Sequence, residues 1–554
     1  MKKTNKILRH LKQSAKQGNI ASLFQLYENY YQGNNFFDRD KEEASKYLSQ
    51  CIEKISNPHR GIILNTFKLR DFRRFSTLDI DFDKRLTVLI GDNGAGKTSI
   101  VESIAKILSW VVANIEKEGK NGKIVSDKDI NVNSDHYASI DVDLSLNQDT
   151  LYTACLARTL KGMINKKSSY IKELRSLSDL YRVSNAYQEI NLPLFAFYSV
   201  ERSHTKLNHS YSLEKTNNIY PHSRFDAYDG ALEGNGRFSD FLEWFIVLDN
   251  LANNELCPDI KSSKLSDEIK MLERIYHQFK DISIQKILKL KQKEYAELFA
   301  EFTVTINDQG KFSEQLKIIK QAIISLVANI SDIYVDRSSG RAEIKVKIKN
   351  QHHSVTINQL SQGQQIIVAL SADLARRLIM LNPKHSNPLE GQGIVLIDEI
   401  ELHLHPRWQQ NIVLGLQETF PRLQFIITTH SPQVLSTVDV SAIRQLDENP
   451  DGSITITKPT FQTKGIISSD VLEQVMGTFA TPQVKEAKWL EDFHIYIEEG
   501  RQEEADAQVL FRKLKKHFGK DHPEIERCNS QIRLQKMKAR ARQRMKNIQK
   551  NEKS

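Results

Sequence analysis

The segment RLTVLIGDNGAGKTSIVESIAKIL, residues 85–108, limits the possible folds of this chain more than any other. Residues 86–90 are apolar and rich in β-branched side chains, as in a short buried strand of a parallel sheet. From Ile100 to Leu108, apolar residues recur at helical spacing. Three glycines, a lysine and a threonine separate the two patterns. The segment therefore predicts an α/β fold in which a glycine-rich loop joins a parallel strand to a helix.

This loop has the composition of a phosphate-binding site. Its glycines let backbone N–H groups turn toward one anion, and the helix N-terminus adds partial positive charge. Lys97 would reach the β- and γ-phosphates of a nucleotide, and Thr98 would bind Mg²⁺. We therefore expect ATP and Mg²⁺ as ligands. The expected nucleotide-binding residues are Gly91, Asp92, Asn93, Gly94, Ala95, Gly96, Lys97, Thr98 and Ser99.

Two later apolar runs also end in polar residues. Residues 394–397 precede Asp398 and Glu399, and residues 425–428 precede His430. Parallel strands end at one edge of a sheet, so these side chains should lie near the phosphate loop. Consecutive strand residues point in opposite directions, which gives the two acids different roles. Asp398 would hold Mg²⁺ through water, and Glu399 would polarise an attacking water.

Two further features precede or follow these acids. Ser361 and Gly363 lie just before a helical pattern, where Ser361 would cap the helix. A serine and a glycine at a helix N-terminus could equally form a second anion site. His403 and His405 have an unfavourable spacing for a metal site, and Pro406 follows at once. We expect these histidines to shape the loop after the acids.

Composition sets broader limits. A chain of 554 residues with 40% hydrophobic and 27% charged residues is typical of a soluble protein with several domains. It has neither a secretory leader pattern nor an apolar run of membrane-spanning length, so we expect a cytoplasmic protein with no membrane contact. The four cysteines are far apart and contain no CxxC pair, which favours isolated reduced thiols.

Patterns along the chain divide it into five regions. The expected boundaries are 1–60 for a helical, tetratricopeptide-like segment, 61–200 for the first lobe, 201–340 for a helical insertion, 341–465 for the second lobe and 466–554 for a helical, basic C-terminal region. One helix pair cannot bury its own apolar face, so the first segment should dock on the body, a neighbouring subunit or a partner. Within 264–299 we expect one or two amphipathic helices. Arg202, His204 and His209 are interpreted as surface residues, without assigned chemistry.

The net charge of +9 is concentrated at the C-terminus. Residues 531–554 contain nine Lys or Arg and one acid, Glu552. Such a run is either a solvated tail or an arm for nucleic acid phosphates or an acidic partner. No aromatic residue interrupts it, which disfavours base stacking and favours an electrostatic contact.

A family resemblance follows from five motifs in order: GDNGAGKT (91–98), LSQGQ (360–364), LIDE (396–399), ELHLHP (401–406) and TTHSP (428–432). Over residues 62–450 the chain resembles ABC-type ATPases, which include SMC and RecF proteins and the overcoming-lysogenization-defect nucleases. The resemblance implies a P-loop ATPase head with a mixed or parallel sheet, a β-rich lobe and a helical lobe. The short helical N-terminal segment and the helical, basic C-terminal tail lie outside it.

By this resemblance, each motif has a role. Lys97 and Thr98 match Walker A, Asp398 and Glu399 match Walker B, and His430 matches the switch histidine. Ser361, Gly363 and Gln364 match the signature, which in the family contacts ATP held by the other subunit. Ser361 follows Lys97 by 264 residues. In this family the signature faces away from its own phosphate loop, so the resemblance implies that two heads close around two ATP molecules. Gln362 replaces a usual glycine, and no Q-loop glutamine can be assigned, because the context of Gln188 does not match.

The compact head is most similar to the PtuA ATPases of Septu-type antiphage defence, including those encoded beside retrons. This resemblance implies a homodimer or higher homo-oligomer that controls a separate PtuB-like HNH nuclease. It also implies a retron reverse transcriptase and its multicopy single-stranded DNA as partners. No carboxylate cluster of a Toprim nuclease is evident, so we expect ATPase activity without nuclease activity in cis. The alternative is a RecF-like repair ATPase that clamps duplex DNA.

Overall fold

The computed structural model describes residues 2–34, 36–57, 61–134, 136–147, 149–163, 167–204, 223–235, 238–253, 268–276, 284–293, 309–338, 342–351, 353–479 and 481–551. The chain forms two compact units, Met1–Ser468 and Ser469–Ser554. Each unit is described separately below.

A six-stranded mixed sheet forms the centre of the first unit, with strand order β13-β12-β3-β11-β10-β6. All pairs are parallel except β12 with β13. The three central strands β3, β11 and β10 are almost entirely buried, which is why their sequences are mainly apolar. The strands are β3 (Leu86–Gly91), β6 (Leu194–Tyr198), β10 (Gly393–Ile397), β11 (Leu423–Thr428), β12 (Ile443–Glu448) and β13 (Ile454–Thr457).

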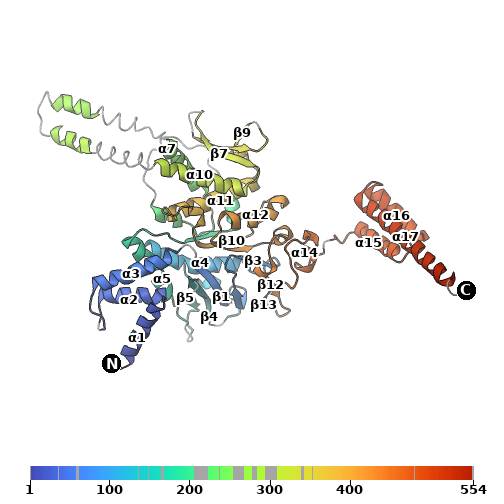
Figure 1. Ribbon diagram of the computed structural model, residues 1–554, viewed down its shortest axis with the longest axis horizontal. Coiled ribbons are helices and arrows are strands. Elements are labelled where there is room, and N and C mark those ends of the chain that lie inside the picture. The colour runs from blue at the N-terminus through green and yellow to red at the C-terminus, as the bar shows by residue number, and fades with distance from the viewer. Residues whose placement is uncertain are drawn as a thin grey trace. The chain divides into compact units, whose positions relative to one another are not determined.

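One face of this sheet carries α4 (Lys97–Glu116), beyond which lies a second, antiparallel sheet (Figure 1). Among the described residues, only α4 has the length and hydropathy of a membrane span, and 78% of that stretch is buried in the protein, as in a core helix. The second sheet has the order β2-β1-β4-β5 and is the expected β-rich lobe. Its strands, and the helix that follows them, are β1 (Ile62–Phe72), β2 (Phe75–Asp81), β4 (Tyr137–Leu146), β5 (Thr150–Thr159) and α5 (Lys172–Tyr187).

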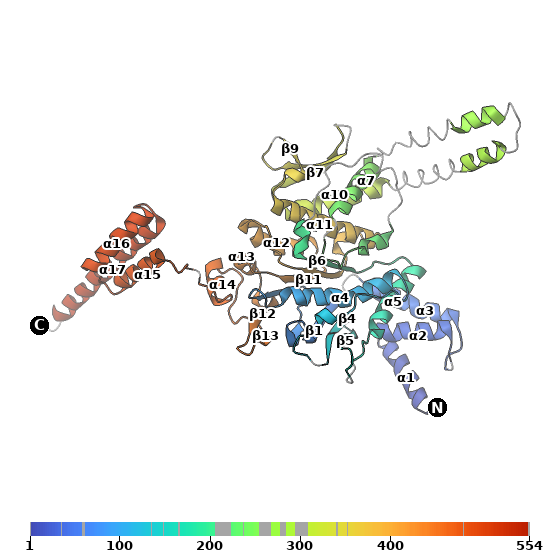
Figure 2. The ribbon, with the colours of Figure 1, turned by 180° about the vertical axis from the view of Figure 1, so that it is seen from behind.

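The opposite face carries a helical lobe, which Figure 2 shows from behind. α11 and α12 lie nearest the sheet, and α10 packs on both. A three-stranded antiparallel sheet of order β7-β8-β9 lies beyond α10. The elements are α7 (Phe238–Asn253), α10 (Gln309–Leu326), β7 (Ile330–Asp336), β8 (Glu343–Ile348), β9 (Ser354–Thr356), α11 (Gln362–Leu381), α12 (Pro406–Thr419) and α13 (Pro432–Leu435). Residues 268–276 and 284–293 are also helical.

The N-terminal segment docks on the body of its own chain. It consists of α1 (Lys2–Lys16), α2 (Ile20–Gln32) and α3 (Lys41–Ile55), and both α2 and α3 contact α5. The backbone N–H of Ile20 donates to Thr150 Oγ1 at 3.3 Å, and Asn147 Nδ2 donates to the Lys54 carbonyl at 3.2 Å. The sequence left three possible docking surfaces for this segment. The structure shows that the body of the same chain covers at least part of α2 and α3.

Helices are the only regular secondary structure among the described residues of the second unit. It contains most of α14 (Ser468–Gln474), then α15 (Lys485–Glu498), α16 (Ala505–Phe518) and α17 (Pro523–Asn551). The last three helices share a small core of Phe493, Ile497, Ala507, Phe511, Leu514, Ile525 and Cys528. Beyond Ile532, α17 has no buried residue among those whose exposure is described, and its end extends past α15 and α16 (Figure 1).

Candidate active site

As expected, three strands end side by side, at the carboxyl ends of the parallel strands of the central sheet. β3, β11 and β10 are parallel neighbours, with Leu89 beside Thr428 and Ile427 beside Ile397. Their carboxyl ends therefore deliver the phosphate loop, the segment after Thr428 and the two acids after Ile397 to one place. The sequence-based prediction of a common edge is confirmed.

The phosphate loop has the backbone conformation that its glycines permit. Gly91, Gly94 and Gly96 have φ angles of 147°, 83° and 99°. A Cβ on Gly96 would lie 2.3 Å from the ring of Phe75, so a larger residue is excluded by space as well as by conformation. Gly96 is also the N-cap of α4 and provides no side-chain cap. The first N–H groups of α4 are thus available to an anion.

Lys97 and Thr98 follow at the start of α4. Lys97 Nζ donates to the carbonyls of Gly91 and Asp92 at 2.9 and 3.0 Å, so its ammonium lies over the loop. Burial lowers the Lys97 pKa, and the charge of Asp398 partly opposes that effect. Thr98 Oγ1 donates to Asp398 Oδ2 at 2.8 Å. A hydroxyl and a carboxylate are hard oxygen ligands of the kind that Mg²⁺ prefers, so these two residues fit the expected metal.

Asp398 and Glu399 lie just beyond β10, in a turn. Thr428 Oγ1 donates to Asp398 Oδ1 at 2.6 Å and accepts from the N–H of Glu399 at 2.8 Å. Glu399 has φ of 45°, the left-handed conformation. The prediction that strand alternation separates the two acids is therefore wrong in its cause, because the strand ends at Ile397 and the turn redirects Glu399.

Glu401 connects the turn after β10 to the candidate switch histidine. Its carboxylate accepts from Thr429 Oγ1 at 2.7 Å and from the N–H of His430 at 2.5 Å. Burial and the nearby Lys97 charge lower the His430 pKa, so its ring is neutral at pH 7. Sequence reasoning assigned no role to Glu401, although it begins the ELHLHP motif.

The prediction that Arg202 is a surface residue is wrong. It is only 8% exposed, and its guanidinium donates to the carbonyls of Asp398 and Glu399. His209 and the side chain of His204 lie outside the described residues. Gln188 ends α5 and precedes the amino end of β6, so it lies at the opposite edge of the sheet from Asp398. At the carboxyl end of β6, which lies on the same side of the sheet as the candidate site, the next residues are those around Arg202.

The signature segment begins α11. Ser361 is its N-cap and forms a capping box with Gln364, whose Oε1 accepts from the N–H of Ser361 at 2.9 Å. Gly363 packs against the turn after β10, since a Cβ there would lie 2.6 Å from the His403 carbonyl oxygen. His405 caps α12, so both histidines shape this turn as expected. The described hydrogen bonds between Ser361 and Gln364 stay within the signature, and the side chains of Lys97 and Thr98 bond to the loop carbonyls and to Asp398.

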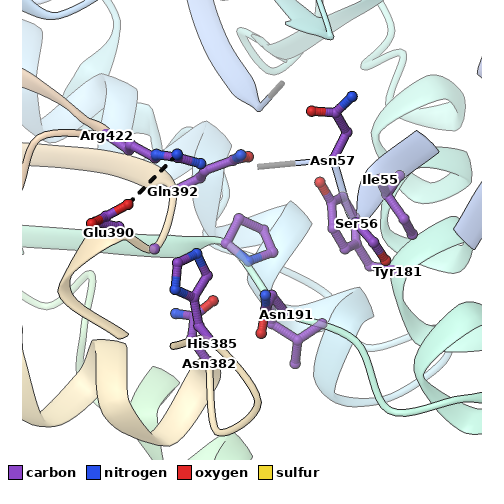
Figure 3. Close-up of a pocket in the computed structure, with 13 residues that line it drawn as sticks. Ile55, Ser56, Asn57, Tyr181, Asn191, Asn382, His385, Glu390, Gln392 and Arg422 are labelled. Atoms are coloured by element: carbon purple, nitrogen blue, oxygen red, sulfur yellow. Dashed lines mark ion pairs between the residues drawn. The ribbon is translucent and has the colours of Figure 1, made fainter. Parts of the chain in front are cut away.

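A separate pocket lies at the other edge of the central sheet (Figure 3). It is open to solvent and lies between the end of the N-terminal segment and residues that precede β6 and β10. Arg422 and Glu390 form an ion pair beside it, with 3.6 Å between Nη2 and Oε2. Since parallel strands bind ligands at their carboxyl ends, this pocket is not the nucleotide site.

Comparisons with known proteins identify the family of this chain. The family model described as AAA ATPase domain matches residues 63–435. The Retron Vc95 probable ATPase of Vibrio cholerae is 32% identical over 91% of this chain and 96% of its own, and the Retron Ec83 probable ATPase of Escherichia coli is 29% identical over 93% and 94%. A Septu protein PtuA of Bacillus thuringiensis is 23% identical over 80% of this chain and 91% of its own. The chain therefore belongs to the AAA ATPase domain family, together with the retron ATPases and the Septu PtuA proteins.

Proposed function

We propose that this chain is an ATPase of an antiphage defence system whose heads dimerise around ATP and control a separate HNH nuclease. One observation carries the dimerisation step. The phosphate loop and the two acids form one connected half of a site, whereas Gly363 of the signature packs against the turn at 401–405. A signature placed in this way supports a model in which it completes the site of a second copy.

In this model each residue has a defined task. The phosphate loop binds the triphosphate, and Lys97 neutralises its charge. Thr98 and Asp398 would hold Mg²⁺, which when bound supplies charge neutralisation at the β- and γ-phosphates. Glu399 orients and polarises the attacking water, while Glu401 holds His430 beside it. Ser361 of one head contacts the γ-phosphate of ATP held by the other.

ATP-dependent dimerisation is the direct test. Light scattering of the Glu399→Gln variant, which should bind ATP without hydrolysing it, is expected to show a mass increase of one chain or more when ATP and Mg²⁺ are added. ADP should not produce it, because the bridging γ-phosphate is absent. A Ser361→Arg variant, which places a bulky cation at the proposed interface, should still bind ATP but stay at its starting mass. An unchanged mass in Glu399→Gln with ATP bound would contradict the proposal.

We infer the proposed partners from the relatives. Retron and Septu names among the relatives support a PtuB-like HNH nuclease and a retron reverse transcriptase with its multicopy single-stranded DNA as partners. Affinity purification of the chain from cells that carry its native locus should recover these components. Defence against phage should be lost in Lys97→Ala and Glu399→Gln while the protein still folds. Full defence in both variants would contradict an ATP-driven role.

We further propose that the exposed part of α17 contacts nucleic acid phosphates. Its exposed basic residues are Arg533, Lys536, Lys538, Arg540, Arg542 and Arg544. Like charges four residues apart destabilise an isolated helix, so a polyanion would stabilise this one. Replacing Arg540 and Arg544 with Gln should reduce the slope of log K against log salt for single-stranded DNA by about one per charge. Arg527→Gln, a control on the same helix whose side chain pairs with Glu524, should leave the slope unchanged.

The RecF-like alternative predicts a different DNA preference. A repair clamp requires duplex binding that depends on ATP and falls steeply with salt. Binding of a single strand without ATP, with weak duplex binding, would favour the defence role. ATP-dependent duplex binding, together with replication genes beside the native gene, would favour the clamp instead.

A further inference from the structure

Arg202 lies at the end of β6, where the chain leaves the edge of the central sheet. β6 pairs with β10 in parallel, and the backbone N–H of Asp398 donates to the Tyr198 carbonyl at 2.8 Å. A short 3-10 helix, Val200–His204, then brings Arg202 back over the end of β10. Its Nη1 donates to the carbonyls of Ser199 and Asp398 at 2.9 and 2.5 Å. Its Nη2 donates to the Glu399 carbonyl at 2.6 Å.

These bonds complete a clamp on two consecutive peptide groups. On the other side of the turn, Thr428 holds the Glu399 N–H and the Asp398 carboxylate through its hydroxyl. Thr428 also accepts at its carbonyl from the Ile400 N–H at 3.1 Å. Glu399 thus has both its N–H and its C=O fixed by side chains. A non-glycine residue keeps a left-handed conformation only when its surroundings hold it there.

Nearby acidic residues partly offset the cost of burying the Arg202 charge. Its guanidinium is buried, and burial lowers its pKa to about 10, with the nearby charges of Asp398, Glu401 and Glu399 opposing that shift. Burying a cation is costly unless it is paired and fully hydrogen-bonded. A planar guanidinium can bridge two carbonyls at once, which the single ammonium of a lysine does less well.

We propose that Arg202 is a positioning residue for ATP hydrolysis, which sets the direction of Glu399 and the location of Asp398 by holding their backbone carbonyls. The inference rests on the proposed function, in which these acids orient water and bind Mg²⁺. Its described hydrogen bonds all reach the backbone of Ser199 and of the two acids. Its loss should therefore affect hydrolysis and Mg²⁺ binding much more than binding of the nucleotide itself.

The chain provides a matched control in Arg224. Arg224 also bridges two backbone carbonyls, those of Ile190 and Leu381, and its side chain is 13% exposed. Ile190 precedes β6 and Leu381 is the last residue of α11, so these carbonyls lie away from the carboxyl ends of the strands. Replacing either arginine removes a cation that bridges two segments, although Arg202 is buried and Arg224 is partly buried. Only Arg202 bridges the two acids.

The experiment compares Arg202→Ala, Arg202→Lys and Arg224→Ala in the full-length protein. Arg202→Ala should lower kcat by 10-fold or more, raise the Mg²⁺ concentration for half-maximal binding of an ATP analogue several-fold and change nucleotide affinity less than threefold. Arg202→Lys should keep part of kcat. Added guanidinium chloride at millimolar concentration should partly restore kcat in Arg202→Ala. Arg224→Ala should lose thermal stability alone.

Several outcomes would overturn the proposal. One is a folded Arg202→Lys or Arg202→Ala variant with wild-type kcat and wild-type Mg²⁺ dependence. Another is a variant whose defects match those of Arg224→Ala, since Arg202 would then be only structural. A wild-type protein that binds ATP without hydrolysing it would instead count against the proposed ATPase function. The Mg²⁺ titration would still decide the role of Arg202 in that case.

Discussion

The two halves of the candidate site both begin helices, but the chain builds them differently. α4 starts after Gly96, a left-handed glycine that provides no side-chain cap. α11 starts after Ser361, whose hydroxyl accepts from the Gln364 N–H at 3.4 Å, while Gln364 caps Ser361 in return. The first helix leaves its N-terminal N–H groups to a ligand, whereas the second satisfies part of its own.

This difference indicates a division of labour. The phosphate-loop half connects directly to the metal-binding acid through Thr98 and Asp398. The signature half connects to the turn at 401–405, where Glu401 also holds His430. Substitutions in the first half should therefore abolish binding or chemistry, and substitutions in the second should mainly weaken assembly. The following predictions test that separation, from the largest effect to the smallest.

Lys97→Ala should produce the largest loss. Its ammonium donates to two loop carbonyls and therefore lies at the loop that is expected to bind the triphosphate. Loss of charge-assisted bonds to the β- and γ-phosphates should weaken ATP binding by about 10- to 100-fold and remove detectable turnover. Calorimetry with ATP measures the change. Lys117→Ala, an exposed site at the far end of α4, should bind ATP normally.

Glu399→Gln should separate chemistry from binding. The amide keeps the shape of the side chain but cannot accept a proton, so turnover should fall about 100-fold or more. ATP affinity should change little, because the phosphate loop is intact. A phosphate-release assay and a binding titration on the same sample measure both. Normal turnover in this variant would remove Glu399 from the mechanism, and Glu418→Gln on the exposed face of α12 controls for the lost charge.

The parts of this site that follow local patterns could be predicted from the sequence. The phosphate loop, the two acids and His430 each follow a buried apolar strand, and parallel strands must end together. The N-cap role of Ser361 also depends only on residues next to it. Local residue patterns were therefore sufficient to predict which residues lie at the carboxyl ends of the central strands.

Arg202 and the conformation of Glu399 could not be predicted in this way. Arg202 binds backbone carbonyls 196 and 197 residues later, and a backbone carbonyl leaves no mark on the sequence. A left-handed glutamate has no residue signature either, because the conformation is imposed by neighbours. The docking of the N-terminal segment on α5 also depends on residues that are distant in the sequence. The sequence therefore left the body, a neighbouring subunit and a partner as three possible docking surfaces.

Gly363→Ala should test the signature half. The new methyl group would lie 2.6 Å from the His403 carbonyl oxygen, so the start of α11 or the turn must move. Overpacking of this kind costs about 1–3 kcal/mol, and we expect ATP-dependent dimerisation to weaken about 10-fold. ATP binding by one head should persist, as measured by titration at low protein concentration. Gly310→Ala, which meets no atom within 4 Å, is the matched control.

The pH dependence of turnover should show the smallest effect. Burial and Lys97 lower the His430 pKa below its ordinary value of 6.5, so the ring stays neutral as the pH falls from 8 to 6.5. Protonation would place a second cation beside Lys97, so turnover should decline only at lower pH, with folding stability from this group also lost as pH falls. His430→Gln should flatten that acidic limb of the kcat profile by a few-fold. If the acidic limb of the profile is unchanged in His430→Gln, a group other than His430 sets the decline of kcat at low pH. Turnover would then give no evidence that Glu401 connects His430 functionally to the signature half.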